Sequence, residues 1–120
     1  MNPLRIFLLA ALILVVFGSM EVEAKEPEWN HTTGGSVYPV SISADGEYIA
    51  AGSNDYKVYL FDKDSSTPLW SYTTGDGVVS VAISTNEEYI VAGSYDDNVY
   101  FFSKDSSTPI WSYGIGDVGR

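Results

Sequence analysis

Few side chains in this 120-residue chain belong to the types that perform catalysis. His31 is the only histidine, and there is no cysteine. A Ser-His-Asp arrangement would therefore have a single candidate base, and a zinc site would have only carboxylates beside one imidazole. We interpret His31 as an exposed strand residue, because Tyr72 takes its place in the repeat described below. We therefore predict no catalytic, cofactor-binding or metal-binding residue, and we expect the protein not to be an enzyme.

Two short motifs have the residue types of a small-ligand or modification site. Residues 62–66 read Asp-Lys-Asp-Ser-Ser and so alternate oxygen ligands as a calcium loop does. The turn glycine and the later bidentate glutamate are missing, and the second copy begins with Ser103, so we interpret the motif as an Asx-type turn. Asn30 opens an Asn-His-Thr acceptor pattern, which makes it a candidate glycosylation site in an exported chain.

A tandem repeat organises the rest of the chain. Its markers are three tryptophans, two glycines and two aspartates at constant spacing: Trp29, Trp70, Trp111, Gly52, Gly93, Asp55 and Asp96. The first repeat runs from Trp29 to Leu69, and more than half of its residues are identical to their counterparts in the second. Identity at this level indicates duplication of one structural unit.

We give these markers structural roles. The paired aspartates fall in predicted hairpin turns, where an Asp side chain caps backbone N–H groups. The paired glycines fall in predicted strands, where a small residue lets neighbouring sheets approach closely. The tryptophans could stack a ligand, but we expect them to pack between units, because they recur at a fixed offset.

Each repeat predicts four short strands, and no helical period occurs after Ala24. The expected strands are 37–43, 47–53, 57–62 and 69–74 in the first repeat, and 78–84, 88–94, 98–102 and 110–113 in the second. An extra outer strand is expected at 28–33, ahead of the first of these. Four strands within a repeat of this length predict an all-β fold of two four-stranded antiparallel units.

The residues of these units resemble the blades of β-propellers. Residues 37–46 (VYPVSISADG) look like the inner strand and turn of a WD-repeat blade, and residues 51–55 (AGSND) and 58–62 (VYLFD) look like the rest of it. Residues 62–75 are also similar to the outer-strand motif of quinoprotein-like, YVTN-type propellers, in which an Asp precedes a docking Trp by eight positions. The resemblance implies two propeller blades in an incomplete ring.

The chain departs from the WD pattern at several positions. The Gly-His dipeptide is replaced by Thr32-Thr33 and again by Thr73-Thr74, so the hydrogen-bonded tetrad built on that His is missing. Phe61 and Phe102 stand where the WD tryptophan would be, and Ser103 replaces the Asp. Ser-Ser-Thr replaces the Thr-Gly-Lys of the quinoprotein motif. The resemblance therefore identifies the superfamily and leaves the subfamily open.

The N-terminal stretch, residues 1–24, predicts export. Arg5 precedes an uncharged apolar run at 6–17, and a small-x-small pattern ends at Ala24, which is the order of a secretory signal. The run is shorter than the roughly 20 residues that a membrane span needs, so we expect a cleaved signal, with an N-terminal membrane anchor as the alternative. The net charge of −10 without any basic cluster argues against a nucleic-acid partner.

The predicted organisation has five parts. They are a signal at 1–24, a linker with the extra outer strand at 25–35, blades at 36–75 and 76–114, and a tail at 115–120. Known propellers close with four to eight blades, so we expect a truncated portion of a longer propeller. The alternative is an oligomer in which several two-blade chains complete one ring, because a monomer would expose apolar blade faces that favour self-association.

Three interpretations of function follow. The favoured one is a secreted or cell-surface, non-catalytic scaffold whose loops bind a protein or a glycan. The alternative is a fragment of a quinoprotein-like dehydrogenase, with pyrroloquinoline quinone held over the ring axis, and the third is a fragment without function. The dehydrogenase needs basic ligands for the cofactor carboxylates, a catalytic carboxylate and a metal. The two near-identical blades offer no such set.

Overall fold

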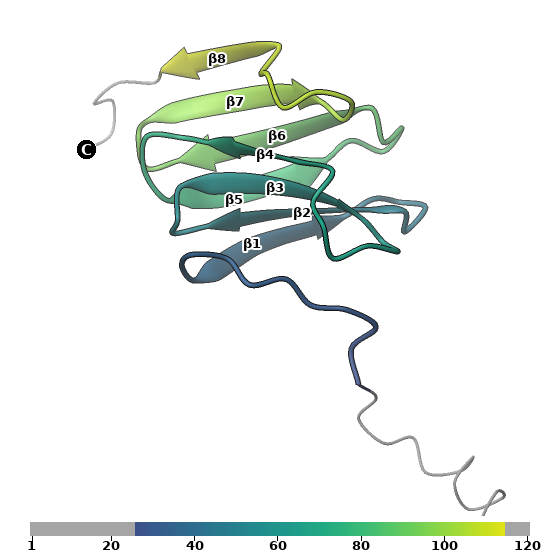
Figure 1. Cartoon of the computed structure of the whole chain (residues 1–120). Helices are drawn as coiled ribbons and strands as arrows, with labels where there is room; N and C mark the ends of the chain where they lie inside the picture. The colour runs from purple at the N-terminus through teal and green to yellow at the C-terminus, as the bar shows by residue number, and fades with distance from the viewer. Residues whose placement is uncertain (1–25, 115–120) are drawn as a thin grey trace, which may run out of the picture.

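The computed structural model describes residues 26–114, so the predicted signal at 1–24 and the predicted tail at 115–120 lie outside the described residues. Eight strands form two four-stranded antiparallel sheets, in each of which the strands follow chain order (Figure 1). We call the first sheet blade 1 and the second blade 2. Blade 1 contains β1 (Val37–Ile42), β2 (Tyr48–Ser53), β3 (Lys57–Asp62) and β4 (Trp70–Thr73); blade 2 contains β5 (Val78–Ile83), β6 (Tyr89–Ser94), β7 (Asn98–Ser103) and β8 (Trp111–Gly114).

The all-β prediction and the four-stranded units are confirmed. Each strand end lies within one residue of its predicted position. Between residues 26 and 114, no helix is long and apolar enough to cross a membrane. Short runs of apolar, β-branched and aromatic residues, bounded by turn residues, were therefore enough to locate the strands.

The predicted outer strand at 28–33 is wrong, because these residues form no strand and join neither sheet. A strand exists only where a neighbour offers free backbone groups, and no strand of either sheet pairs with this segment. Side chains hold the segment against blade 1 instead. The indole N–H of Trp29 donates to the carbonyl of Lys63 at 2.7 Å, and the ring of Trp29 lies 5.3 Å from that of Phe61.

The two blades pack face to face around one buried core. This core contains Ala50, Val58 and Leu60 from blade 1 and Val78, Ile90, Ala92, Tyr100 and Phe102 from blade 2. Gly52 is required for the close approach, since a Cβ added there would overlap the side chain of Val78. The small residue predicted to let neighbouring sheets approach therefore does so in blade 1.

The first strand of each blade contains an irregularity near its start. The pairing of β1 with β2 shifts register between Val37 and Val40, and the pairing of β5 with β6 shifts between Val78 and Ser80. A bulge of this kind re-aims the side chain that it contains. The irregularities include Tyr38 in blade 1 and Val79 in blade 2, which is why these residues matter for the site described next.

Candidate binding site at the loop end of the blade interface

A hollow of about 440 Å³ opens between the blades, at the end where the β2–β3 and β6–β7 turns lie. Its lining combines Tyr38 of β1, Val78 and Val79 of β5, and one residue from each turn, Asn54 and Tyr95. Val78 is buried, whereas Tyr38 and Tyr95 are 75% and 64% exposed. The hollow therefore has an apolar base and two accessible phenol rings.

The chain between β4 and β5 brings the two turns together. A Cβ added at Gly77 would lie 3.0 Å from Oδ1 of Asn54 and 3.6 Å from Cδ2 of Tyr95. Asn54 belongs to blade 1 and Tyr95 to blade 2, so Gly77 lies where side chains from both blades meet. A larger residue at this position would push into the lining of the hollow.

A carboxylate in each turn fixes the backbone that carries these lining residues. In blade 2, Asp96 accepts hydrogen bonds from the backbone N–H of Asn98 at 2.9 Å, from the N–H of Gly75 at 2.8 Å and from the hydroxyl of Tyr100 at 2.5 Å. The bond from Gly75 ties the chain that links the blades to the turn beside Tyr95. Asp96 thus holds two sides of the hollow in register.

Asp55 does the same in blade 1. It accepts hydrogen bonds from the N–H of Lys57 at 2.9 Å, from the N–H of Gly34 at 3.0 Å and from the hydroxyl of Tyr59. Here the bond from Gly34 attaches the N-terminal segment to the turn that carries Asn54. The two turns therefore have matching supports.

A hydroxyl pair completes each support. In blade 1 the hydroxyl of Ser53 donates to that of Thr33 at 3.4 Å and accepts from the N–H of Asp55 at 3.1 Å. Blade 2 repeats this with Ser94, which donates to Thr74 at 3.3 Å and accepts from the N–H of Asp96 at 3.2 Å. The tetrad built on His is missing, as the sequence indicated. A Thr-Ser-Asp-Tyr network links the same kind of loop and turn in its place.

The network also sets the ionisation of its members. Burial by itself raises the pKa of Asp55 and of Asp96, but the hydrogen bonds from Tyr59 or Tyr100 and from backbone N–H groups outweigh it, so both pKa values lie below the ordinary one. Burial and the hydrogen bond to Asp96 raise the pKa of Tyr100 to about 12. Near neutral pH the network consists of ionised carboxylates and neutral phenols.

The residues with candidate chemistry do not gather in one place. His31 lies in the N-terminal segment, with Nδ1 3.0 Å from the carbonyl of Ser66 and its ring 5.3 Å from that of Phe61, so it packs on blade 1 and is not a strand residue. Asn30 is exposed. Asp62 accepts a hydrogen bond from the N–H of Asp64 at 2.9 Å, as in an Asx turn. Within residues 26–114, no group of three or more His, Asp or Glu side chains could hold a metal ion.

The three repeated tryptophans have different surroundings. Trp70 docks on blade 2, where its indole N–H donates to the carbonyl of Lys104 at 2.8 Å and its ring lies 4.9 Å from that of Phe102. Trp29 makes the equivalent contacts on blade 1. Trp111 lies on the free side of blade 2 and is 48% exposed. Trp70 therefore packs between the two blades, as expected. Trp29 packs on blade 1 in the same way, but it comes from the N-terminal segment and not from another blade.

Identity between the repeats does not mark the lining of the hollow. Tyr38 and Val79 occupy equivalent positions of the two repeats, as do Asn54 and Tyr95, and both pairs differ. Four of the five lining residues therefore occupy positions where the repeats have diverged. The β3–β4 and β7–β8 loops, by contrast, share the sequence Lys-Asp-Ser-Ser-Thr-Pro. The divergence of these positions, beside loops that are identical in the two repeats, is the signal by which the site could have been predicted.

Comparisons with known proteins agree with this architecture. The sequence pattern of the family described as WD domain, G-beta repeat matches residues 28–62 and 66–103. No curated protein sequence matches the chain. Among solved structures, BamB from Moraxella catarrhalis is similar with a TM-score of 0.60 and 14% identity, over 69% of this chain and 26% of that one.

These matches bear on fold and family. At 14% identity, the likeness to BamB shows the propeller fold alone, and this chain spans about a quarter of the length of that protein. The two stretches of the family match contain β1 to β3 and β4 to β7, and together they cover more than half of the chain. The chain belongs to the WD40 family of WD-domain, G-beta repeat proteins.

Proposed function

We propose that this chain is a non-catalytic binding module that acts outside the cytoplasm, and that the hollow at the loop end of the blade interface takes a segment of a protein partner. The observation that carries the proposal is the lining itself. Residues that differ between two otherwise similar repeats converge from both blades on one open pocket. A scaffold needs its repeated residues, whereas a ligand site needs residues of its own.

The side chains of the hollow suit a short extended segment with one apolar or aromatic side chain. Tyr38 and Tyr95 offer accessible rings and hydroxyls, and tyrosine is among the residues enriched in binding surfaces. Val79 and the buried Val78 supply an apolar base, while the amide of Asn54 can pair with a peptide backbone. The net charge of −10 favours a segment with basic flanks.

A location outside the cytoplasm rests on the signal pattern at residues 1–24. The pattern of one positive residue, an apolar run and a small-x-small end directs a chain to export. A fusion of the full chain to a reporter enzyme that works only outside the cytoplasm tests this part separately. Activity that is lost when the apolar run is interrupted by charges supports export, and activity that is absent from the start contradicts it.

Selection from a random peptide library tests the ligand. The full chain is immobilised and panned against phage-displayed peptides, and the selected peptides are then titrated against three variants. Tyr38→Ala and Tyr95→Ala remove exposed rings at the hollow, whereas Leu69→Ala removes a 52% exposed side chain at the opposite end of β3. We expect the first two to weaken binding roughly ten-fold or more and the third to leave it unchanged.

Other outcomes contradict the proposal or redirect it. Peptides that bind all variants equally would place the site elsewhere on the chain. A library that yields no binder, together with a glycan array whose signal disappears in Tyr38→Ala and Tyr95→Ala, would assign the hollow to a glycan. Stacking of the two phenol rings on sugar rings would then explain why both tyrosines matter.

A further inference from the structure

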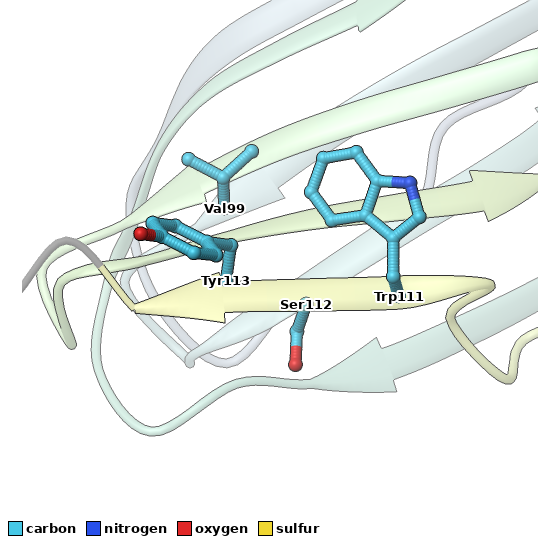
Figure 2. Close-up of a pocket in the computed structure, with 4 residues that line it drawn as sticks. All are labelled: Val99, Trp111, Ser112 and Tyr113. Carbon is cyan, nitrogen blue, oxygen red and sulfur yellow. The ribbon is translucent and has the colours of Figure 1, made fainter.

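The free side of blade 2 carries a set of apolar side chains without a covering element among residues 26–114. A hollow of about 450 Å³ there is lined by Val99, Trp111, Ser112 and Tyr113. Figure 2 shows that Val99, Trp111 and Tyr113 project to one side of the β7–β8 pair, while Ser112 projects to the other. Trp111 and Tyr113 are 48% and 68% exposed. Tyr89, Val91, Gly93 and Phe101 lie on the same side of the sheet, and we call this side the outgoing face.

The blade interface inside the chain shows what such a face binds. Trp70 donates to the carbonyl of Lys104 at 2.8 Å and packs on Phe102. The ring of Tyr72 lies 5.3 Å from that of Tyr100 and 5.4 Å from that of Phe102. Val58 is buried in the same core.

Two further contacts complete that interface. Gly52 leaves the space that Val78 fills. The ammonium of Lys104 lies 5.7 Å from the centre of the Tyr48 ring, within the range of a cation–π contact. The interface thus joins Tyr48, Gly52, Val58, Trp70 and Tyr72 of blade 1 to Val78, Tyr100, Phe102 and Lys104 of blade 2.

All nine of these residues recur unchanged on the two sides of the molecule that face no other blade. The five from blade 1 have identical counterparts on the outgoing face, namely Tyr89, Gly93, Val99, Trp111 and Tyr113. The four from blade 2 have identical counterparts on blade 1, namely Val37, Tyr59, Phe61 and Lys63. We call this second set the receiving face. The two free sides therefore carry the two halves of a contact that the chain already makes.

The N-terminal segment covers part of the receiving face. Trp29 and His31 pack on Phe61. The indole of Trp29 donates a hydrogen bond to the carbonyl of Lys63, as the indole of Trp70 does to that of Lys104. The segment leaves β1 uncovered, because Val40 and Ile42 are both 65% exposed whereas their counterparts in β5 are half-buried. Only Trp29 and His31 of this segment therefore make contacts like those that β4 makes on blade 2.

We propose that the outgoing face of one copy docks on the receiving face of a second copy, and that the N-terminal segment competes for the same place. The indole of Trp111 then donates to the partner copy's Lys63 carbonyl in place of Trp29, and Tyr113 packs on the rings that His31 now contacts. Because the two faces differ, the contact runs head to tail, so it extends the chain of blades or closes it into a ring. A ring of four to eight blades would contain about two to four copies.

Two features modulate this assembly. Ala50 and Leu60 are replaced on the outgoing face by the larger Val91 and Phe101, and Phe101 stacks on Trp111 at 5.2 Å. The outgoing face thus presents more apolar surface than its counterpart in blade 1. The net charge of −10 opposes association of copies, so we expect added salt to strengthen it by screening.

Sizing of the full chain by sedimentation over a range of concentrations is the first test. We expect a concentration-dependent, salt-strengthened assembly that Trp111→Ala or Gly93→Ala weakens roughly ten-fold or more. A Cβ at position 93 meets only the side chain of Ser80 within the chain, with the hydroxyl at 2.6 Å, and that hydroxyl can rotate away. Gly93→Ala therefore leaves the monomer folded while blocking the approach of the partner copy's Val37.

A second pair of variants moves the equilibrium in the opposite direction. Trp29→Ala, alone and with His31→Ala, removes the competitor and is expected to strengthen assembly roughly ten-fold. A chain that stays monomeric in wild type and in both of these variants would overturn the proposal, and would agree instead with a face that meets further blades of a longer protein. Assembly that Trp111→Ala and Gly93→Ala leave unchanged would overturn it as well.

Crosslinking tests the direction of the contact. The chain has no cysteine, so single cysteines can be placed at will. Copies with Tyr89→Cys are mixed with copies with Lys63→Cys and treated with a short bismaleimide; Tyr48→Cys with Lys104→Cys in one chain is the matched internal control. We expect links between unlike copies and within the control chain. Links that form only between two Tyr89→Cys copies would indicate face-to-face pairing and contradict the head-to-tail contact.

Discussion

The same face occurs twice in this molecule, once covered and once bare. On blade 1, Val58 and Leu60 are fully buried against blade 2. On blade 2 the equivalent Val99 and Phe101 are only half-buried, although their strands pair in the same register. Strand formation therefore follows from the repeat itself, whereas burial depends on the next unit, as expected when each repeat contacts only its neighbours.

The two outermost faces of the molecule differ in how they are covered. The side of blade 1 that lacks a preceding blade is covered by Trp29 and His31, and Tyr59 and Phe61 beneath them are buried. The free side of blade 2 has no such cover in the described residues. A short segment with two ring side chains is thus enough to bury the aromatic part of a blade face.

The sharpest test of the comparison is the same substitution at both tryptophans. Trp70→Ala removes a ring packed between blades and a hydrogen bond, so we expect it to cost roughly 3–5 kcal/mol of folding free energy. Trp111→Ala removes a ring that is 48% exposed and makes no hydrogen bond to a second blade, so we expect it to cost the monomer less, roughly 1–3 kcal/mol. Urea titration of dilute protein measures both. Equal losses would mean that the free face is covered in solution.

The turn carboxylates distinguish the link between the blades from the N-terminal segment. Asp96→Ala frees the chain at Gly75, and with three hydrogen bonds lost we expect a cost of roughly 2–4 kcal/mol. Asp55→Ala frees Gly34, which holds only the N-terminal segment, so its cost should be smaller. Chemical denaturation of the two variants, side by side, gives the difference.

Acid should act through the same two carboxylates. Their pKa values are lower in the folded chain than the ordinary 3.8, so their contribution to stability is complete above that value and is lost as the pH falls through the folded pKa. Asp96→Asn is therefore expected to flatten the loss of stability on acidification between about pH 5 and pH 2. An unchanged acid limb would show that other carboxylates dominate it.

Substitution of the paired glycines also compares the covered face with the bare one, with a smaller expected loss of stability. Gly52→Ala forces a methyl group against Val78 in the blade interface, and we expect it to cost roughly 1–3 kcal/mol. Gly93→Ala meets only a serine side chain and should cost the monomer roughly 1 kcal/mol or less. Thermal unfolding at low protein concentration measures the pair. A large loss at position 93 would indicate that the free face is packed even in dilute solution.

Local patterns predicted the strands well because strand-favouring runs and the turn residues that bound them act within a few residues of each other. The prediction of a strand at 28–33 failed because this segment aligns with the outer strand at 69–74 in the repeat, but a strand requires a pairing neighbour that the described residues do not place there. The hollow at the loop end was missed for a different reason. It is lined by Tyr38 of blade 1 and Tyr95 of blade 2, and no pattern within one repeat encodes their shared position at the blade interface.

The smallest expected effect concerns the turn between the first two strands of each blade, where Gly46 of blade 1 is replaced by Glu87 in blade 2. Gly46 has a φ of 76° and its counterpart Glu87 a φ of 61°, so both lie in the left-handed region that favours glycine. Burial and the nearby carboxylate of Asp45 also raise the pKa of Glu87.

Glu87→Gly should therefore raise the melting temperature by roughly 2–5 °C, because it relieves the backbone and the repulsion together. Gly46→Ala, which places a side chain at the equivalent position of blade 1, should lower it by a similar amount. Glu87→Gln separates the two causes: it removes the charge and keeps the backbone strain, so a gain equal to that of Glu87→Gly would assign the whole effect to repulsion. If neither Glu87 variant changes the melting temperature, the two blades do not differ in the stability of this turn.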